Sequence, residues 1–475
     1  MSTTIAIRPV TRVEGHGKIT LHLDDAGQVS DARLHVTQVR GFEKFCEGRP
    51  FTEMPSLMAR ICGICPVSHL LASAKACDEI LAVRIPAAGA RLRRIVHLAQ
   101  TVQSHALSFF YLSSPDLLLG MDAEPARRNV LGVAAEYPEL ARGGIRLRQF
   151  GQQVIESLSG DRVHPHGIVP GGMLQPLDAA QRDAILARIP EAVAFVERTL
   201  ELFTTLDERF REEIATFAHF PSLFLGTVGP RGELELYDGA LRFVDEQGET
   251  VADGIAAEQY RDYIGEAVEP WSYLKMPYYK PLGYPAGMYR VGPLARLNVA
   301  ARCGTPRADV WFDAFRAVDG GCVALSSFHF HLARLIEALY SLEKLDELLR
   351  HPDALDARVR AQAGVNELEG VGIAEAPRGT LIHHYRVDAQ GLITWANLII
   401  ATGHNNLAMN RGILQVAQRF VRGETIGQGA LNRVEAVVRA FDPCLSCSTH
   451  AFGQMPLHLQ LLAPDGKVLD QVMRG

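Results

Sequence analysis

Two short stretches of this sequence decide how the chain must fold: Arg60-Ile61-Cys62-Gly63-Ile64-Cys65-Pro66-Val67-Ser68-His69 near its beginning and Asp442-Pro443-Cys444-Leu445-Ser446-Cys447-Ser448-Thr449-His450 near its end. Each contains a Cys-x-x-Cys pair, which places two sulfur atoms on the same side of a tight turn. Two such pairs offer four thiolates, a soft donor set that favours zinc, iron or nickel over magnesium or calcium. We therefore expect the two ends of the chain to meet at one metal centre.

The main alternative is a structural zinc site built from two Cys-x-x-Cys knuckles. Such knuckles usually lie close together in sequence, whereas almost the whole chain separates Cys65 from Cys444. Flanking residues that could supply charge and hydrogen bonds to metal-bound sulfur are His69, His450, Arg60 and Asp442. This pattern favours a redox-active centre over a zinc knuckle. The other four cysteines, Cys46, Cys77, Cys303 and Cys322, are expected to be buried thiols.

The composition is that of a soluble globular protein. Of the 475 residues, 47% are hydrophobic and 21% are charged, and 48 Lys and Arg residues stand against 54 Asp and Glu residues. There is thus no basic excess that would indicate a nucleic-acid-binding protein. The N-terminus lacks the pattern of a secretory signal, and no apolar run approaches the ~20 residues of a membrane span. The expected location is cytoplasmic.

Hydrophobic periodicity predicts a mostly α-helical chain with several small peripheral β-sheets, an α+β fold. Apolar residues at helical spacing predict long helical regions over 92–112, 178–217 and 320–349. Alternation around turn residues predicts β-hairpins over 17–40, 233–244 and 381–400. A Pro- and Gly-rich irregular segment follows the second hairpin near 276–293.

The two cysteine motifs resemble the two signatures of the [NiFe] hydrogenase large subunit. Three shorter matches lie in the family's order: Arg-Val-Glu-Gly-His at 12–16, Arg-Gly-Phe-Glu at 40–43 and Glu-Ala-Pro-Arg-Gly at 375–379. The resemblance implies a central bundle of long helices and one intertwined catalytic domain over residues 1–450. It also implies reversible heterolytic cleavage of dihydrogen between a metal and a nearby base.

The same resemblance implies a role for each site residue. Cys62, Cys65, Cys444 and Cys447 would bind nickel, with Cys65 and Cys447 also bridging to an iron that holds CO and cyanide. Glu14 would pass protons beside a terminal cysteine, the alternative being a surface salt bridge with Arg12. Arg378 would act electrostatically over the open metal site, because arginine is very hard to deprotonate. Asp116 and Asp442 would be the carboxylate partners of Arg378. His69 would donate a hydrogen bond to a bridging thiolate, the alternative being a core histidine with satisfied hydrogen bonds.

Near the C-terminus, the resemblance implies a second, harder metal site. Glu43 and His450 match ligands of a Mg²⁺ or Fe²⁺ ion, with the backbone carbonyl of Leu398 as a weaker third candidate. The 25 residues after His450, 451–475, resemble an extension that an endopeptidase removes once nickel has entered. The alternative is a permanent C-terminal hairpin.

The sequence most resembles the cytoplasmic bidirectional NAD-linked subgroup. No Gly-x-Gly-x-x-Gly follows a predicted strand, and no cysteine set remains for an iron–sulfur cluster. Electrons would therefore leave through an iron–sulfur small subunit to diaphorase subunits that carry FMN and bind NAD, and maturation would need the endopeptidase and nickel-insertion factors. The alternatives are a related hydrogenase that uses NADP, a deazaflavin or another acceptor, a metal-free quinone module like that of complex I, and a hydrogen-sensing regulatory protein.

Overall fold

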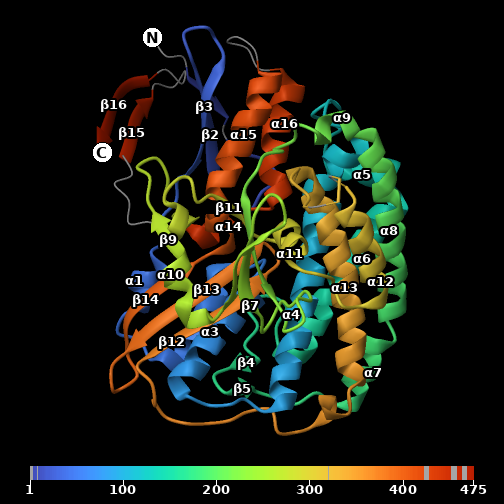
Figure 1. Cartoon of the computed structure of the whole chain (residues 1–475), viewed down its shortest axis with the longest axis vertical. Helices are drawn as coiled ribbons and strands as arrows, with labels where there is room; N and C mark the ends of the chain where they lie inside the picture. Colours follow the sequence, from blue (N-terminus) through green and yellow to red (C-terminus); the bar gives the residue numbers. More distant parts are fainter. Residues whose placement is uncertain are drawn as a thin grey trace.

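The computed structural model describes residues 4–7, 9–318, 320–321, 323–421, 427–450, 457–462 and 468–474, with side chains described up to His450. A bundle of long helices forms one side of the molecule, and small sheets with shorter helices form the other (Figure 1). The ends of the described chain lie on the sheet side, where the C-terminal strands β15 (Leu457–Leu462) and β16 (Val468–Arg474) pair with each other. The predicted α+β class, mostly helical with small sheets, is confirmed.

Four helices make up the core of the bundle: α4 (Ala87–Leu107), α6 (Pro138–Ser159), α8 (Ile189–Arg209) and α13 (Phe330–Arg350). Helix α4 packs against both α6 and α13, and α13 packs against α8. Most residues of α4 and α13 are buried, including polar ones. A helix that is buried on most sides has no wide polar face, which explains why 92–112 was the clearest helical pattern in the sequence.

Two predicted helical regions have different boundaries in the structure. The region 178–217 is divided into α7 (Ala179–Leu186), α8 and α9 (Arg211–Ile214). Pro190 stands in the first turn of α8, where its missing N–H removes no helical hydrogen bond. The region 320–349 was predicted to start too early, since Gly320 and Gly321 have φ values of 84° and 94° and the helix α13 begins at Phe330.

Helix α4 continues directly into two π-helical segments, η3 (Ser108–Ser113) and η4 (Pro115–Leu119). Pro115 has no N–H to offer to a regular helical turn. The wider turns bring Asp116 into the interior, where its side chain is almost completely buried. Such π-helical insertions often occur at functional sites.

The helix that follows the first cysteine pair, α3 (Pro66–Leu81), lies on a three-stranded antiparallel sheet. The sheet contains β12 (Glu369–Ala376), β13 (Gly379–Val387) and β14 (Ile393–Ile399), in that order. The predicted hairpin over 381–400 is therefore confirmed as β13 and β14. Arg378 lies in the tight connection between β12 and β13, at the edge of the sheet next to α3 and α11 (Pro293–Val299).

The predicted hairpin over 233–244 is wrong. Strand β7 (Ala240–Val244) pairs instead with β6 (Leu223–Val228) and β8 (Thr250–Ile255), and β11 (Tyr289–Arg290) joins this sheet next to β6. The segment before Asp238 cannot run straight because the Glu235 carboxylate accepts the backbone N–H groups of Tyr237 and Asp238. Glu235 also binds Arg94 of α4, so that this segment is drawn to the bundle.

The N-terminal strands β1 (Thr4–Ile7), β2 (Gly17–Leu23) and β3 (Val29–Val36) form an antiparallel sheet, which confirms the hairpin predicted over 17–40. Helix α15 (Asn406–Phe420) packs on β3 and on α16 (Gln428–Phe441). The remaining elements are α1 (Phe42–Cys46), η1 (Phe51–Glu53), α2 (Met54–Met58), η2 (Ala59–Ile61), α5 (Val130–Glu136), β4 (Ile168–Val169), β5 (Gly172–Met173), η5 (Ala257–Gln259), α10 (Tyr260–Tyr263), β9 (Ile264–Ala267), β10 (Met276–Tyr279), η6 (Lys280–Leu282), α12 (Pro306–Arg316), η7 (Ser327–His329), η8 (Pro352–Leu355), α14 (Ala401–His404) and η9 (Ser446–Ser448).

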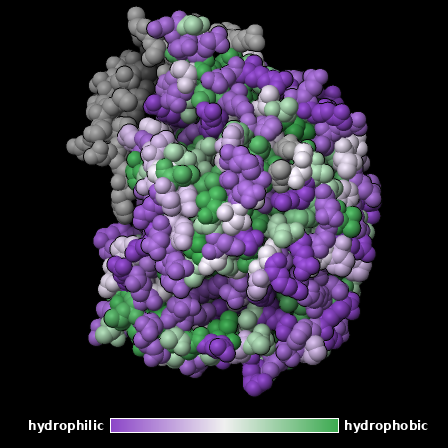
Figure 2. All heavy atoms as spheres, viewed as in Figure 1, coloured by the Kyte–Doolittle hydropathy of each residue, from purple (hydrophilic) through white to green (hydrophobic). Residues whose placement is uncertain are grey.

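On the surface, hydrophobic residues are scattered. Figure 2 shows small hydrophobic patches interspersed among hydrophilic residues on the face in view. Within the described ranges, no helix has the length and apolar character needed to cross a membrane.

The close packing of α3 on β12 leads to a prediction about Gly372. A Cβ atom on Gly372 would lie 1.9 Å from the Ala72 carbonyl oxygen, which belongs to the backbone of α3 and cannot move aside. We expect Gly372→Ala to lower the free energy of unfolding by about 3 kcal/mol, as overpacking of a tight core does. Gly364→Ala is the matched control, since nothing lies within 4 Å of its Cβ position. Calorimetric unfolding of the two variants checks this, and equal stability would show that α3 can shift on the sheet.

Candidate metal centre

The first cysteine pair lies at the junction between η2 and α3. Cys65 is the residue just before α3, and Pro66 takes the first helical position. The Cys65 sulfur thus belongs to a helix N-terminus, where the helix dipole favours a negative charge. The Cys62 sulfur accepts the backbone N–H of Ile64 at 3.2 Å, which holds it on the inner side of the turn.

The second pair lies just beyond the end of α16. The helix ends at Phe441, and Asp442 follows with a left-handed backbone (φ 53°), a conformation that Asp tolerates better than most residues. Pro443 then prevents the helix from continuing. The Cys444 N–H donates to the Thr402 hydroxyl of α14 at 2.8 Å, which fixes the loop that carries both sulfurs.

The structure brings the four predicted cysteine ligands together in the interior. Their sulfur atoms all lie within 4.8 Å of one another, and all four residues are buried. The Sγ–Sγ distances are 3.3 Å for Cys62 and Cys444, 3.8 Å for Cys65 and Cys447, and 2.8 Å for Cys444 and Cys447. These exceed the disulfide length of about 2.05 Å, so the cluster consists of free thiols that surround a common point.

The protonation of this cluster is shared among its members. Hydrogen bonds from the other three thiols lower the pKa of Cys65 well below its usual value. Burial, followed by the neighbouring sulfurs, raises the pKa values of Cys444 and Cys447. A second and third negative charge are therefore costly unless a cation arrives. Four buried thiols with this property fit a metal that displaces protons as it binds.

Glu14 reaches the metal cluster from the N-terminal segment. Its carboxylate oxygen Oε2 accepts hydrogen bonds from the Cys444 thiol at 3.0 Å and from the Ser446 N–H at 3.2 Å. Gly15 allows this approach, because at φ 85° a Cβ atom there would lie 2.8 Å from Leu445 Cβ. Arg12 binds Asp116 rather than Glu14, so the geometry does not support the alternative of a surface salt bridge.

Arg378 lies over the cluster and is fixed by Asp442. Its Nε donates to the Asp442 carbonyl at 2.6 Å, its Nη2 to the Asp442 carboxylate at 3.1 Å and its Nη1 to the Ser104 hydroxyl at 3.3 Å. Burial acts to lower the pKa of Arg378, but Asp442 and the nearby cysteine sulfurs outweigh it and raise the pKa above its usual value. The guanidinium therefore stays charged, which fits an electrostatic role and not that of a base.

Two predicted contacts are wrong. Asp116 was predicted to be a partner of Arg378, but its carboxylate binds Arg12 at 2.5 Å and Arg439 at 2.9 Å. Asp116 was misplaced because the π-helical turns at the end of α4 direct it toward α16. Arg60 was predicted to serve the metal-bound sulfurs, but it is exposed at the end of η2.

His69 lies on the first turn of α3 next to Cys65. It lowers the pKa of the Cys65 thiol through a hydrogen bond, although this is a smaller effect than that of the other thiols. The His69 Nδ1 atom lies 3.2 Å from Nε2 of His383 on β13. The ring therefore connects the thiol cluster with the sheet, and His383 is a buried neighbour that the sequence did not reveal.

The second predicted metal site contains a lysine that the sequence analysis missed. The Glu43 carboxylate accepts hydrogen bonds from the Lys275 ammonium and from the Leu398 N–H, both at 2.8 Å. His450 is neutral, since burial lowers its pKa to about 3. Its Nε2 donates to the Cys447 carbonyl at 2.7 Å and its buried Nδ1 has no partner, a lone pair that could face a cation. Leu398 therefore offers Glu43 its N–H, which the sequence analysis did not predict.

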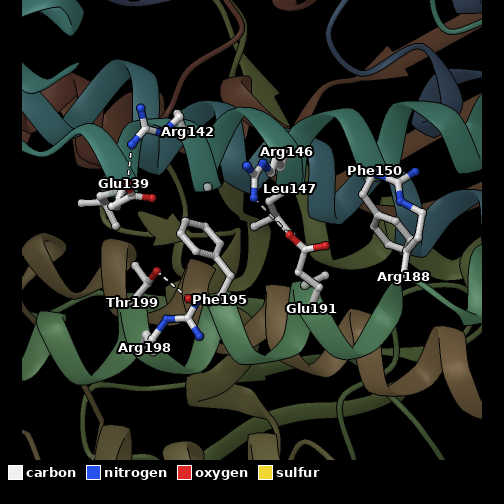
Figure 3. A pocket seen from close by; sticks show the side chains of 13 residues that line it. Glu139, Arg142, Arg146, Leu147, Phe150, Arg188, Glu191, Phe195, Arg198 and Thr199 are labelled. Atoms are coloured by element: carbon white, nitrogen blue, oxygen red, sulfur yellow. Dashed lines mark hydrogen bonds and ion pairs between the residues drawn. The ribbon is translucent and has the colours of Figure 1, made fainter.

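Outside the metal centre, a groove of about 340 Å³ lies between α6 and α8. Figure 3 shows Arg142 and Arg146 of α6 on one wall and Phe195 and Arg198 of α8 on the other. Arg142 pairs with Glu139, and Arg146 pairs with Glu191. The groove contains none of the predicted site residues. Of the four cysteines predicted to be buried thiols, Cys46, Cys77 and Cys303 are buried, and Cys322 lies outside the described residues.

The pairing of Asp116 leads to a prediction about stability and pH. Burial alone would raise the pKa of Asp116, but Arg439 and Arg12 outweigh it and lower the pKa. This contribution to stability is fully present above the unfolded pKa, roughly 3.9, and is lost as the pH falls through the lower folded pKa. At neutral pH we expect Asp116→Asn to cost about 3 kcal/mol, because two buried arginines lose their partner.

The control is Asp31→Asn, which removes an exposed pair with Arg33 and should cost less than about 1 kcal/mol. Unfolding measured from neutral to acidic pH should show the deficit of Asp116→Asn shrinking as the pH falls. A deficit that did not depend on pH would contradict the assignment of the stabilisation to the Asp116 charge.

Comparisons with known proteins agree with this geometry. A model of the nickel-dependent hydrogenases matches residues 40–137 and 236–450, and a HoxL-like model matches residues 4–39. The β subunit of the NAD-reducing hydrogenase HoxS of Cupriavidus necator is 42% identical over the full length of both chains. The corresponding polypeptide of the F420-non-reducing hydrogenase vhc of Methanococcus voltae is 41% identical, over 98% of this chain and 99% of its own.

Solved structures show the same relationship. An NAD⁺-reducing [NiFe]-hydrogenase in the H2-reduced state has 47% identity and a TM-score of 0.92, over 95% of this chain and 100% of its own. The Ni-Fe-Se hydrogenase of D. vulgaris Hildenborough has 25% identity and a TM-score of 0.74, over 95% of this chain and 100% of its own. With its two cysteine pairs joined in one buried cluster and its family model matched from both ends, this chain belongs to the nickel-dependent hydrogenases.

Proposed function

We propose that this chain is the catalytic large subunit of an NAD-linked [NiFe] hydrogenase, which catalyses H2 + NAD⁺ = H⁺ + NADH. The observation that carries the proposal is the buried cluster of four free thiols from opposite ends of the chain. The full-length relative from Cupriavidus necator and the solved structure with a TM-score of 0.92, both of them NAD-reducing hydrogenases, support the choice of acceptor.

In this proposal the four cysteines share one nickel–iron group. Cys62 and Cys444 hold nickel as terminal ligands, and Cys65 and Cys447 bridge nickel to an iron that carries CO and cyanide. When bound, this group supplies the Lewis acidity and the redox capacity for splitting dihydrogen. Thiolates are the appropriate donors for such metals, and the helix N-terminus at Cys65 favours the ionised sulfur.

The chain's own residues manage the proton and the electrostatics. Glu14 takes the proton from the Cys444 sulfur, because its carboxylate lies within hydrogen-bond distance of that sulfur, at 3.0 Å. Arg378 keeps its charge over the open side of the cluster and is oriented by Asp442. His69 donates a hydrogen bond to the bridging sulfur.

The electrons leave through other subunits. The single buried cysteines Cys46, Cys77 and Cys303 do not approach one another closely enough to form a second group of possible metal ligands in the described residues. We therefore propose two kinds of partner, namely diaphorase subunits with FMN and NAD and an iron–sulfur small subunit. By resemblance to the NAD-linked subgroup, the complex is cytoplasmic.

We also propose the second metal site and the removal of the tail. Glu43, His450 and the Leu398 carbonyl would hold Mg²⁺ or Fe²⁺, with Lys275 displaced from Glu43. Residues 1–450 would form the mature catalytic domain, and residues 451–475 would be cut off by an endopeptidase after nickel-insertion factors have acted. In support, the NAD⁺-reducing solved chain is matched in full by 95% of this one, which leaves about 24 of 475 residues over.

A second candidate is a hydrogenase with another electron acceptor. The F420-non-reducing hydrogenase of Methanococcus voltae is almost as similar as the NAD-reducing relative, at 41% against 42% identity. Hydrogen-dependent reduction of NAD⁺, NADP⁺ and a deazaflavin by the purified complex distinguishes the two candidates. Reduction of NAD⁺ alone supports the first.

Nickel content tests the ligand assignment directly. We expect about one nickel per chain in the complex purified from its own cells, as four thiolates around one metal require. Cys447→Ala should abolish both nickel binding and hydrogen oxidation. Cys303→Ala, which removes a buried thiol away from the cluster, should leave both unchanged. Zinc in place of nickel, or an active Cys447→Ala variant, would overturn the proposal.

The role of Glu14 is tested by Glu14→Gln. The amide preserves the size of the side chain but cannot carry the proton, so we expect hydrogen-dependent NAD⁺ reduction to fall about 100-fold while nickel content stays the same. Glu47→Gln is the control, because Glu47 is a carboxylate paired with Lys44 on the surface. If Glu14→Gln turned over like the wild type, another group would have to receive the proton.

A further inference from the structure

A closed chain of buried hydrogen bonds connects the residue next to Cys65 with the sheet behind it. His69 Nδ1 lies 3.2 Å from His383 Nε2, His383 Nδ1 lies 2.7 Å from the Tyr385 hydroxyl, and Tyr385 donates to Ser73 at 2.9 Å. His69 and Ser73 are one turn apart on α3, and His383 and Tyr385 share one face of β13. The chain therefore leaves α3, crosses the sheet and returns to α3.

All four side chains are buried, with exposed fractions of 1% or less. A polar group in such surroundings is costly unless it is hydrogen-bonded. Apolar side chains of the same size would satisfy the packing between α3 and β13 at lower cost. Four polar groups in series at this position call for an explanation beyond packing.

The chain determines which edge of the His69 ring faces the thiols. Burial lowers the pKa of His383 well below its usual value, so the ring is neutral and carries one N–H. Because Tyr385 donates its proton to Ser73, its oxygen accepts from His383 Nδ1, and His383 Nε2 then accepts from His69 Nδ1. His69 Nδ1 is thus committed to the sheet, and Nε2 is the nitrogen that remains for Cys65.

We propose that His383, Tyr385 and Ser73 are positioning residues, which hold His69 in one orientation against Cys65 and thereby tune the sulfur that bridges nickel and iron. The inference rests on the proposed function, since it assumes that Cys65 is a metal ligand. It adds three residues that do not touch the cluster and act through His69. The next neighbours of a ligand set commonly control the electronic properties of a metal in this way.

Tyr385→Phe tests the proposal, because it removes the middle hydrogen bonds and keeps the ring. In the purified complex, the infrared bands of the CO and cyanide on the iron report the electron density that reaches the metal through the bridging sulfurs. We expect at least one band to shift and hydrogen oxidation to fall about ten-fold, with nickel content unchanged. The control is Tyr340→Phe, which removes a buried tyrosine hydroxyl bound to the Leu234 carbonyl and should change neither measurement.

Two further variants protect the test against a folding defect. Ser73→Ala breaks the chain at its far end with a smaller change, and Ser73→Thr retains the hydroxyl and should preserve the wild-type spectrum. Wild-type bands and turnover in both Tyr385→Phe and Ser73→Ala would overturn the proposal and leave the chain a purely structural link. Absence of nickel from the wild-type complex would instead refute the proposed function, and with it the assumption about Cys65.

Discussion

The fold of this chain depends on one requirement: two pairs of thiols 382 residues apart must meet within the span of one metal centre. Closing a loop of this length costs only about 5 kcal/mol, since the entropy grows with the logarithm of length. The harder task is to hold four buried sulfurs at fixed positions. Helix α3 achieves this for Cys65 by packing on the sheet β12–β14, and α16 with Thr402 achieves it for Cys444.

Charges around the cluster are arranged by the same elements. Asp442 ends α16 and at the same time fixes Arg378, so the loop that carries two sulfurs also orients the cation above them. Asp116 connects Arg439 of α16 with Arg12 of the N-terminal segment, two residues before Glu14. The proton acceptor and the cysteine beside it are thus held by one buried ion-pair network, although Asp116 itself contacts neither.

The sequence predicted the parts of the site that depend on spacing and failed where the route of the chain decides. The Cys-x-x-Cys pairs, Glu14 and the Arg378–Asp442 pair are short-range patterns, and the structure places them together. Asp116 was assigned to the wrong arginine because π-helical turns cannot be read from periodicity. Lys275 and His383 were missed because they approach the site from strands whose neighbours depend on tertiary packing. For the same reason the hairpin over 233–244 was wrong: Glu235 binds the bundle instead of continuing a strand.

The protonation pattern of the cluster explains why burial and metal binding belong together. Without a cation the four thiols support one stabilised thiolate at Cys65, and burial raises the pKa values of Cys444 and Cys447 against further ionisation. Arg378 can balance little of this charge, because its guanidinium is already paired with Asp442. Metal cations must therefore replace the protons for all four sulfurs to become ligands, and their binding contributes to the stability of the fold. A site exposed to water would lose this coupling, since solvent would stabilise the thiolates directly.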